Sequence, residues 1–408
     1  MENIKEILKK YKQEHLLMFY DSLSFDEKQQ FLNEISNINF EEIMNMRNVQ
    51  ETVKLSQDIK PVKSVLRSEL LPNEVRELEE RGRGIIKNGN YAVVTMAGGQ
   101  GTRLGHNGPK GTYSLKLWDK EKFIFEIFVD YLKEIYKKYG VFLCWYIMTS
   151  RENNSDTINF FEVNSYFGYP KEKIKFFMQG ELPITDMEGN LLLESKSKLL
   201  KAADGNGGVF NALSNVLQDM KENKIQWVLI TGVDNILVNL ADELFIGLVD
   251  KENNLNGVKS VSKEAPEERV GVFCKRNGKP SVIEYTEMDE SMRYGKDENG
   301  KLRFIEANIV NHLINIQVLD KIQNEKLPIH KAVKKMPYID KQGRMQNPSI
   351  PCLIKYEAFI FDYFNKVDDV TILRVEREKE FAPVKNKEGA DSPETAIKLF
   401  NMLHSKEV

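Results

Sequence analysis

Apolar residues in the middle of the chain fall into short continuous runs separated by helical patterns. The runs predict strands buried on both faces, because such strands carry few polar positions. The predicted strands are residues 91–96, 142–148, 174–178 and 227–231. Helical spacing of apolar residues predicts helices from Phe123 to Gly140 and within residues 207–220. This alternation, from about residue 85 to 316, predicts an α/β fold with a doubly wound, mostly parallel sheet.

The flanks of this middle part have different patterns. The first 85 residues read as helices, and Ser24 to Glu27 form a typical helix start. We also predict a β-hairpin within residues 270–285, a helix at 357–364, a strand at 370–375 and a last helix from Ser392-Pro393. The predicted regions are an N-terminal helical region (1–85), a main domain (86–336) and a small C-terminal α+β region (337–408).

A glycine-rich segment follows the first predicted strand and reads A-G-G-Q-G-T-R-L-G-H-N-G-P-K-G from Ala97 to Gly111. Glycines allow backbone N–H groups to approach a phosphate chain closely, and Arg103 and Lys110 add positive charge. The segment lacks the G-x-x-x-x-G-K-[ST] pattern, and no helix opens inside its glycine run as a dinucleotide fingerprint requires. A plain turn with two solvated cations is the alternative, but the strand, glycines and cations together favour a phosphate loop.

Asp234 stands just past the predicted strand at 227–231. A carboxylate at a strand end suits Mg²⁺, which binds through one or two carboxylates plus substrate phosphate oxygens. The alternative is a helix N-cap, a role that Asp also fills well. The phosphate loop predicted at another strand end favours the metal, because ligands of such sheets bind where the strands end.

Several other polar residues are weaker candidates when each is taken alone. Gln179 ends a predicted strand, and Asn206 lies in a second glycine-rich loop that is equally typical of a plain turn. Glu284 and Tyr285 end a hairpin strand and could contact sugar hydroxyls. Lys355 and Lys385 stand next to apolar residues, where most lysines are solvated. These are the remaining candidates that the pattern offers.

Composition and charge narrow the classes of partner. The chain has 408 residues and a net charge of −3, which gives no reason to expect nucleic acid as a partner. Three scattered cysteines predict free thiols in a reducing compartment, and no cysteine–histidine cluster has zinc spacing. We see neither a signal peptide nor an apolar run long enough for a membrane, so we expect a cytoplasmic protein. The oligomeric state, monomer or dimer, stays open.

Taken together, these motifs resemble the UDP-sugar pyrophosphorylase family, and within it the UDP-N-acetylhexosamine branch. The resemblance covers about residues 60–400. Its motifs, in order, are Ala97–Gly105 with Pro109–Gly111, Trp145–Ser150, Gln179-Gly180, Asp204–Gly208, Val233–Val238, Glu284-Tyr285, Asn308-Ile309 and Phe381–Asn386. It implies a Rossmann-like (GT-A-like) nucleotidyltransferase that converts UTP and a sugar 1-phosphate into a UDP-sugar and pyrophosphate with Mg²⁺.

The resemblance also implies roles for individual residues. It implies nucleotide binding by Ala97, Gly98, Gly99, Gly101, Thr102, Gln179, Gly205 and Lys355. It implies sugar binding by Asn206, Glu284, Tyr285 and Asn308. It implies that Arg103, Lys110 and Lys385 act on phosphates in catalysis and that Asp234 holds Mg²⁺. This chemistry needs no nucleophilic triad, because the attacking phosphate oxygen is already an anion and the obstacle is repulsion between two polyanions.

Two departures from the branch concern the expected sugar pocket. The branch commonly has F-N-A-G-N where this chain has Phe304–Asn308, and P-D-G-N-G-G-L-Y where it has Ala203–Phe210. The resemblance to the branch makes N-acetylglucosamine 1-phosphate the first expectation, and these departures keep glucose 1-phosphate or a broad sugar range as the alternative. A non-catalytic nucleotide-sugar sensor is the alternative of another class, which the intact Arg103, Lys110 and Asp234 disfavour.

Overall fold

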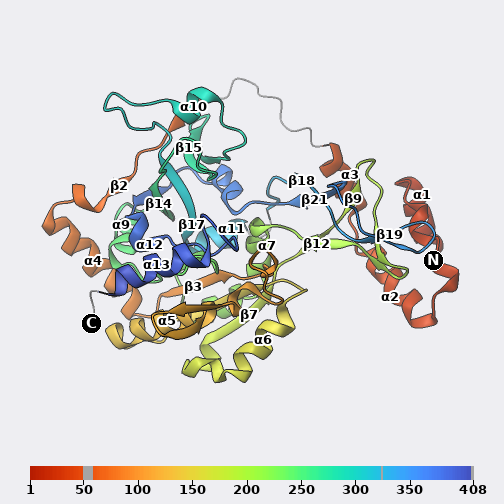
Figure 1. The fold of residues 1–408 in the computed structure, drawn as a ribbon, viewed down its shortest axis with the longest axis horizontal. Coiled ribbons are helices and arrows are strands. Elements are labelled where there is room, and N and C mark those ends of the chain that lie inside the picture. Colours follow the sequence, from red (N-terminus) through yellow and green to blue (C-terminus); the bar gives the residue numbers. More distant parts are fainter. Residues whose placement is uncertain (49–57, 323–324, 406–408) are drawn as a thin grey trace. The chain divides into compact units, whose positions relative to one another are not determined.

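The computed structural model describes residues 1–48, 58–322 and 325–405, and it divides into two compact units (Figure 1). The first unit comprises the described parts of Met1–Ser56, Gly180–Gly208 and Lys326–Ile360. The second comprises the described parts of Gln57–Gln179, Val209–Glu325 and Phe361–Val408. The three consecutive regions expected from the sequence are a different division of the chain, and their boundaries stay a prediction.

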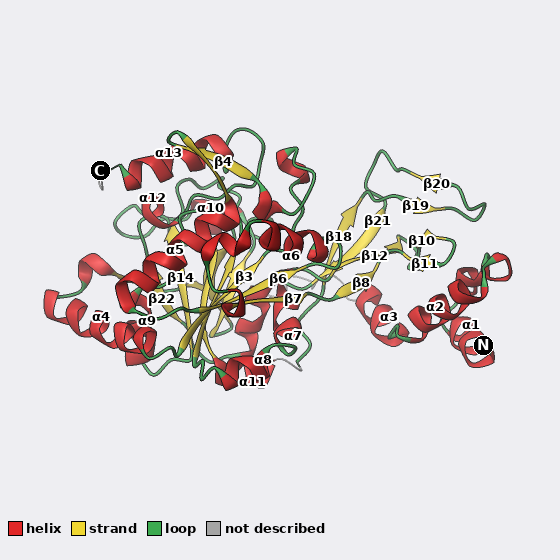
Figure 2. Cartoon of the chain, turned by 90° about the horizontal axis from the view of Figure 1, so that it is seen from below, coloured by secondary structure: helices red, strands yellow, loops and turns green. Residues whose placement is uncertain are grey.

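A large mixed sheet forms the centre of the second unit (Figure 2). Its order is β2 (Val65–Leu66), β22 (Thr371–Arg374), β14 (Asn256–Ser262), β17 (Glu306–Asn315), β13 (Trp227–Gly232), β3 (Tyr91–Met96), β6 (Cys144–Thr149) and β7 (Ile174–Met178). Strands β13, β3, β6 and β7 are parallel, as are β2, β22 and β14. Only β17 is antiparallel to both of its neighbours along this order. The mostly parallel α/β sheet predicted from the sequence is thus confirmed.

The predicted strands of the middle region are confirmed with small shifts of their ends. β3 and β7 have the predicted bounds. β6 begins at Cys144 rather than at residue 142 and ends at Thr149, and β13 ends at Gly232, one residue later than predicted. All six residues of β3 are buried, as its continuous apolar run predicts. In the parallel register, Met96 lies beside both Met148 and Gly232. The carboxyl ends of these strands therefore meet at one edge of the sheet.

Helices of the second unit pack on this sheet in one large apolar core. The core joins side chains of α4 (Pro72–Lys87), α5 (Ile124–Tyr139), α6 (Asn154–Val163), α9 (Glu243–Lys251) and α13 (Pro393–His404). α5 ends as predicted at Gly140, whose φ of +75° is the left-handed conformation that glycine favours. The other helices of this unit are α7 (Val209–Leu213), α8 (Leu217–Glu222), α10 (Glu290–Tyr294), α11 (Ile316–Ile322) and α12 (Arg377–Glu380).

Two hairpins complete the strands of the second unit, and the first of them joins the large sheet through its first strand, which pairs with β17. β15 (Val272–Arg276) and β16 (Lys279–Ile283) form the predicted hairpin, and its turn has positive φ at Asn277 and Gly278. β1 (Ile59–Pro61) pairs with β15, so part of the region expected to be helical is strand. β4 (Ser114–Leu117) and β5 (Lys120–Phe123) form the second hairpin.

The first unit combines N-terminal helices with short strands. Its helices are α1 (Glu2–Lys10), α2 (Phe25–Ser36) and α3 (Phe40–Asn48), and α2 begins with the predicted capping box of Ser24 and Glu27. Its strands are β8 (Glu181–Pro183), β9 (Thr185–Asp186), β10 (Leu193–Ser195), β11 (Lys198–Leu199), β12 (Lys201–Ala203), β18 (His330–Lys334), β19 (Tyr338–Ile339), β20 (Met345–Gln346) and β21 (Leu353–Glu357). Across the described ranges, no helix has the length and apolarity that a membrane span would need.

Two helix predictions were wrong in detail. The helix expected at 357–364 is β21 followed by a 3₁₀ segment, Ile360–Lys366. Only Glu357 of the expected helix is drawn into β21, which pairs with β18 and β9, and most of the rest is helical in the tighter 3₁₀ form. The helix expected within 207–220 is split into α7 and α8 by a turn.

Candidate active site

The glycine-rich segment forms a compact loop at the carboxyl end of β3. The N–H of Gly101 donates to the carbonyl of Gly108 over 2.9 Å, and the N–H of Lys110 donates to the carbonyl of Gly99 over 3.0 Å. These bonds fold the loop back on itself. In the described part of the chain, the N–H groups of Gly98 and Gly99 donate to no other residue. They are therefore available to an anion, as a phosphate loop requires.

Gln179 lies against the backbone of this loop. A Cβ added at Gly98 would be 2.5 Å from Oε1 of Gln179, so only glycine leaves room for that side chain. Gln179 follows β7, and its N–H donates to the carbonyl of Thr149 over 2.9 Å. The structure thus brings together two residues that lie 81 positions apart and that the resemblance assigns to the same nucleotide.

Asn153 fixes the same loop, and sequence reasoning missed it. Its side chain is fully buried, and its Nδ2 donates to the carbonyls of Ala97 (2.9 Å) and Gly99 (3.4 Å). Its Oδ1 accepts the N–H of Ser150 over 2.8 Å. An asparagine shortly after a buried strand is a signal for such side-chain to backbone bonds, and this one could have been found by that signal.

His106 is a second missed residue of the loop. Its ring fills the space beside Gly101, where an added Cβ would lie 2.7 Å from the Cβ of His106. Its Nε2 lies 2.8 Å from Oγ1 of Thr112, and that hydroxyl donates to the carbonyl of Pro109 over 2.8 Å. Because the hydroxyl proton is already used, Nε2 must be the donor in the first bond. His106 thereby braces the loop around Lys110.

Asp234 and Lys385 are brought together by a short pairing between distant segments. The N–H of Val384 donates to the carbonyl of Asp234 over 2.8 Å, and the N–H of Ile236 donates to the carbonyl of Ala382 over 3.2 Å. Between them, the buried side chain of Asn235 accepts the N–H of Ala382 (2.9 Å) and donates to the carbonyl of Glu380 (2.8 Å). This pairing aligns the two segments beside the glycine loop, since the N–H of Val233 donates to the carbonyl of Met96, the last residue of β3.

The charges of three other candidate residues act on the pKa of Lys110. Its side chain is partly buried, and burial is the main reason that its pKa lies below the usual range. The carboxylate of Asp234 raises this pKa, whereas the cations of Arg103 and Lys385 lower it. Arg103 is exposed on the 3₁₀ turn Thr102–Leu104. One electrostatic neighbourhood therefore contains all four residues predicted for catalysis and metal binding.

The carboxylate of Asp234 fits a divalent cation that is shared with a substrate. Within the described part of the chain, its side chain makes neither a hydrogen bond nor an ion pair, and no three His, Cys, Asp or Glu residues are grouped to hold a metal. Mg²⁺ is usually bound through one or two carboxylates and completes its octahedron with phosphate oxygens and water. A single unpaired carboxylate beside a phosphate loop is compatible with that mode of binding.

Two of the predicted sugar contacts meet around Gly271. The N–H of Asn308 donates to the carbonyl of Gly271 over 2.9 Å, and a Cβ added at Gly271 would lie 2.9 Å from Oε1 of Glu284. Tyr285 follows directly, and its carbonyl accepts a bond from Arg293 over 3.0 Å. The structure thus brings Glu284 and Asn308 together, although they lie in different strands or strand ends.

The departure at Glu306 has a structural explanation. Its carboxylate is buried and accepts bonds from Ser64 (2.7 Å) and Ser260 (2.6 Å). Arg374 pairs with both of its oxygens. A buried carboxylate needs such partners to offset its desolvation. Glu306 therefore serves the sheet in this chain, and its carboxylate is fully engaged there.

The remaining candidates, Gly205, Asn206 and Lys355, belong to the first unit. Gly205 has a φ of +90°, and Oδ1 of Asn206 accepts the N–H of Ile360 over 2.9 Å. Nζ of Lys355 lies 2.5 Å from Oε1 of Glu357. Burial raises the pKa of the neighbouring Asp204 to about 6, against the opposing charge of Lys355. The second glycine loop and Lys355 are thus neighbours within this unit, and their roles stay predictions.

Comparison with known proteins identifies relatives over nearly the whole chain. The model of the family described as UTP–glucose-1-phosphate uridylyltransferase matches residues 34–403. A probable UDP-N-acetylglucosamine pyrophosphorylase of Dictyostelium discoideum is 37% identical, covering 96% of this chain and 86% of the relative. The UDP-N-acetylglucosamine pyrophosphorylase of Saccharomyces cerevisiae is 34% identical, with coverage of 97% and 88%. The crystal structure of the Trypanosoma brucei enzyme of that name is similar, with a TM-score of 0.83, 29% identity and coverage of 98% and 84%.

Proposed function

This chain belongs to the UTP–glucose-1-phosphate uridylyltransferase family, and we propose that it is a UDP-N-acetylglucosamine pyrophosphorylase. In this reaction, a phosphate oxygen of N-acetylglucosamine 1-phosphate attacks the α-phosphorus of UTP. A new P–O bond forms to the sugar phosphate, and the bond between the α-phosphorus and the bridging oxygen to the β-phosphate breaks. The products are UDP-N-acetylglucosamine and pyrophosphate.

The observation that carries this proposal is the folded glycine loop with Arg103 and Lys110 at the end of β3, with the Asp234 segment bonded both to that strand and to the segment of Lys385. Both substrates are polyanions, so catalysis depends on reducing their repulsion and on aligning them in line. Cations on a phosphate loop and on a separate segment are suited to the two phosphate groups. No general base is required, because the attacking oxygen carries negative charge at neutral pH.

The residues divide this work in the following way. The backbone of residues 97–102 and the amide of Gln179 bind UTP, while Arg103 and Lys110 neutralise its phosphates. Lys385 binds the phosphate of the sugar, and Glu284, Tyr285 and Asn308 contact its hydroxyls and acetamido group.

Mg²⁺ fits this site through Asp234. When bound there together with phosphate oxygens, it would supply positive charge against the charge that develops during phosphoryl transfer. Lys110 and Lys385 hold the phosphates next to this carboxylate, so their ammonium groups also reduce repulsion between Asp234 and the substrates. Asn235 keeps the carboxylate in place through its bonds to the segment that precedes Lys385.

The experiment that tests this function is pyrophosphate release from UTP and Mg²⁺ with a panel of sugar 1-phosphates. The panel contains N-acetylglucosamine, N-acetylgalactosamine, glucose and galactose 1-phosphates. We expect release with the N-acetylated sugars and little with the others. Release that is strongest with glucose 1-phosphate would overturn the sugar assignment and would point to residues 304–308, where this chain departs from the branch.

A non-catalytic sensor would behave differently in the same experiment. It would bind UTP or a UDP-sugar, as calorimetry would detect, without releasing pyrophosphate from any member of the panel. We expect turnover, because a sensor has no need to retain Lys110, Asp234 and Lys385 in one neighbourhood. Binding without turnover would overturn the proposed function while leaving the family unchanged.

A further inference from the structure

A fully buried lysine lies between two carboxylates in the second unit. Lys259 is on β14, and its side chain has no exposed surface. Its Nζ lies 2.6 Å from Oδ2 of Asp242 and 2.5 Å from Oε2 of Glu380. The ring of Phe245 covers it, with 5.5 Å between Nζ and the ring centroid. Removing the cation would leave two neighbouring carboxylates with no shared counter-charge, which is strongly unfavourable in a buried position.

The two carboxylates belong to the two segments that carry Asp234 and Lys385. Asp242 ends the loop that begins just after β13 with Asp234, and it caps α9 by accepting the N–H of Phe245 over 3.2 Å. Glu380 ends α12, five positions before Lys385. The ion pairs of Lys259 therefore hold two points of the chain. One is Asp242, at the end of the loop that begins with Asp234, and the other is Glu380, just before the residues that pair with that loop.

The Asp234 loop is anchored at two further points between Asp234 and Asp242. The hydroxyl of Tyr131 donates to the carbonyl of Ile236, and that of Tyr91 donates to the carbonyl of Leu240, each over 2.6 Å. On the other segment, the carbonyl of Glu380 accepts the side-chain bond of Asn235. The contacts form a continuous path from Lys259 to both residues.

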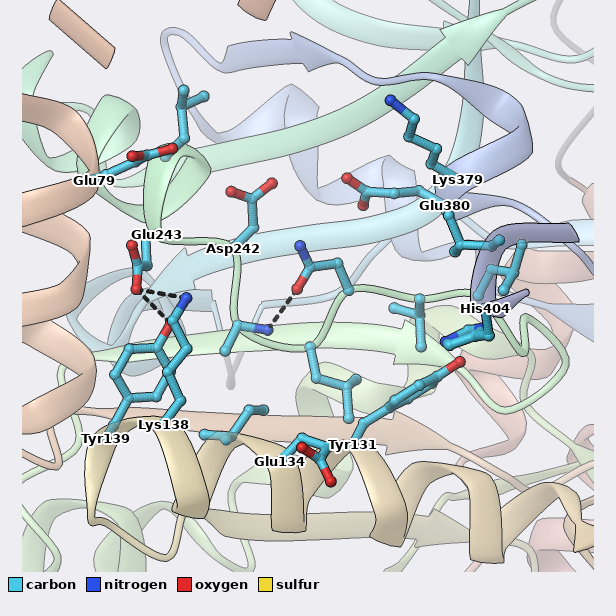
Figure 3. A pocket seen from close by; sticks show the side chains of 18 of the residues that line it. Glu79, Tyr131, Glu134, Lys138, Tyr139, Asp242, Glu243, Lys379, Glu380 and His404 are labelled. Carbon is cyan, nitrogen blue, oxygen red and sulfur yellow. Dashed lines mark hydrogen bonds and ion pairs between the residues drawn. The ribbon is translucent and has the colours of Figure 1, made fainter. Parts of the chain in front are cut away.

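A pocket of about 600 Å³ opens beside this ion cluster, and Asp242 and Glu380 line it. Figure 3 shows Asp242 and Glu380 as neighbours on the wall of the pocket. Tyr131 and His404 also line it. The two segments are also bonded directly, because Nδ2 of Asn235 donates to the carbonyl of Glu380. The ammonium group of Lys259 adds a second link, which joins the side chains of Asp242 and Glu380.

We propose that Lys259 is a positioning residue that, together with the bond between Val384 and Asp234, keeps the segments of Asp234 and Lys385 aligned. The inference rests on the proposed function, since it concerns the alignment of two groups that serve the same phosphoryl transfer. Lys259 itself reaches neither substrate. It acts through Asp242 and Glu380, and its loss shifts Lys385 and Asp234 relative to each other without altering the glycine loop.

The test compares Lys259→Met with Lys259→Arg in the full-length protein, using pyrophosphate release at varied Mg²⁺ and UTP. We expect Lys259→Met to lower kcat by about 10²-fold, as a displacement of about 1 Å does in other sites, and to raise the half-saturating Mg²⁺ concentration. KM for UTP changes little, because the glycine loop and Gln179 follow β3 and β7, whereas the ion pairs of Lys259 join β14 to other segments. Lys259→Arg keeps the charge and recovers most of the rate.

Arg83→Met is the control for losing a partly buried cation in the same unit. Arg83 donates to Glu243 over 2.8 Å, and Glu243 keeps Lys138 and Tyr139 as partners. This variant should lose some thermal stability and retain its kcat. If Lys259→Met likewise loses stability but keeps the wild-type kcat and Mg²⁺ dependence, the positioning role is wrong.

Glu380→Gln covers the case in which Lys259→Met does not fold. It weakens the link to the Lys385 segment and leaves the Asp242–Lys259 pair intact. We expect a lower kcat with a similar KM for UTP, and a wild-type kcat would overturn the inference. A wild-type protein without activity on any sugar would instead overturn the proposed function, which separates the two failures.

Discussion

The backbone N–H of Val384 donates to the carbonyl oxygen of Asp234 over 2.8 Å, although the two residues lie 150 positions apart in the chain. This bond places Lys385, the next residue, beside the segment of Asp234 at the end of β13, while its ammonium group lies 3.5 Å from Oδ2 of Asp391. Neither residue is informative alone, because lone lysines and strand-end aspartates are common on protein surfaces. Their juxtaposition beside a phosphate loop makes them a credible pair for handling two phosphate groups.

Lys385→Ala should lower kcat for pyrophosphate release by about 10²-fold or more, because it removes a preorganised charge next to the reacting phosphates. Steady-state kinetics with N-acetylglucosamine 1-phosphate measures this. Lys387→Ala is the matched control, since Lys387 is an exposed lysine two residues later. Similar losses in both variants would mean that the segment tolerates no change, and would contradict a specific role for Lys385.

Asp234→Asn keeps the size of the side chain and removes its charge. We expect turnover to fall by about 10²-fold or more, because loss of the metal's charge removes several kcal/mol of transition-state stabilisation. Calorimetric titration of UTP should also lose its dependence on added Mg²⁺. The control is Asp250→Asn, because Asp250 lies in α9 and forms an ion pair with Arg81. This variant should leave both turnover and the Mg²⁺ dependence of UTP binding unchanged. Mg²⁺-dependent UTP binding by Asp234→Asn would place the metal elsewhere.

Asn153→Asp should weaken UTP binding more than it destabilises the fold. The new carboxylate can still accept the N–H of Ser150, but it cannot donate to the carbonyls of Ala97 and Gly99. It would set negative charge against those oxygens and displace the glycine loop. We expect KM for UTP to rise with a smaller change in kcat. An unchanged KM would show that Asn153 only supports the strand end.

Two glycines of α4, Gly82 and Gly84, should respond oppositely to alanine. A Cβ at Gly82 would collide with the backbone carbonyl of Glu243 in α9, whereas a Cβ at Gly84 meets nothing within 4 Å. Gly84→Ala should stabilise the protein by about 0.5–1 kcal/mol, the usual helix preference for alanine over glycine. Gly82→Ala should destabilise it by about 1–3 kcal/mol through overpacking. Denaturant unfolding of both variants measures this, and equal effects would contradict the close contact of the two helices.

The stability of the first unit should depend on pH through Asp204. Burial raises the pKa of this carboxyl to about 6 from 3.8, so the folded state binds the proton more tightly than the unfolded state. Its contribution to stability is therefore fully present below about pH 4 and is lost as the pH rises through about 6. Asp204→Asn should be more heat-stable than the wild type at pH 8, and the difference should shrink towards low pH.

Asp340→Asn is the control of opposite sign in the same unit. The pKa of Asp340 is lowered, chiefly because its carboxylate accepts the N–H of Arg344 over 2.9 Å. Its stabilising contribution is present above the unfolded pKa and is lost as the pH falls through the lower, folded value. This variant should be less stable than the wild type at pH 8. If both variants changed thermal stability at pH 8 in the same direction, burial would not be the cause of the raised pKa of Asp204.

The sequence by itself determined the elements whose signals are local. The continuous apolar run at 91–96 predicted β3, and the glycines with Arg103 and Lys110 predicted the phosphate loop that follows it. These signals are readable because burial on both faces of a strand and tight backbone turns restrict the residues at consecutive positions. The resemblance to the family depends on the same local motifs, and the comparisons confirmed it.

Only the tertiary structure decided which distant residues meet. The contact of Gln179 with Gly98, the bonds of Asn153 to the loop and the pairing of Asn235 with residues 380–382 leave no periodic trace in the sequence. The start of the predicted helix at 357–364 was wrong for the same reason, since partners in β9 and β18 draw Glu357 into a strand and the helical turn that follows is the 3₁₀ segment Ile360–Lys366. Lys259 looks like any lysine in a strand until Asp242 and Glu380 are seen on either side of it. Burial and charge balance are properties of the folded chain, because they depend on partners that the order of residues does not name.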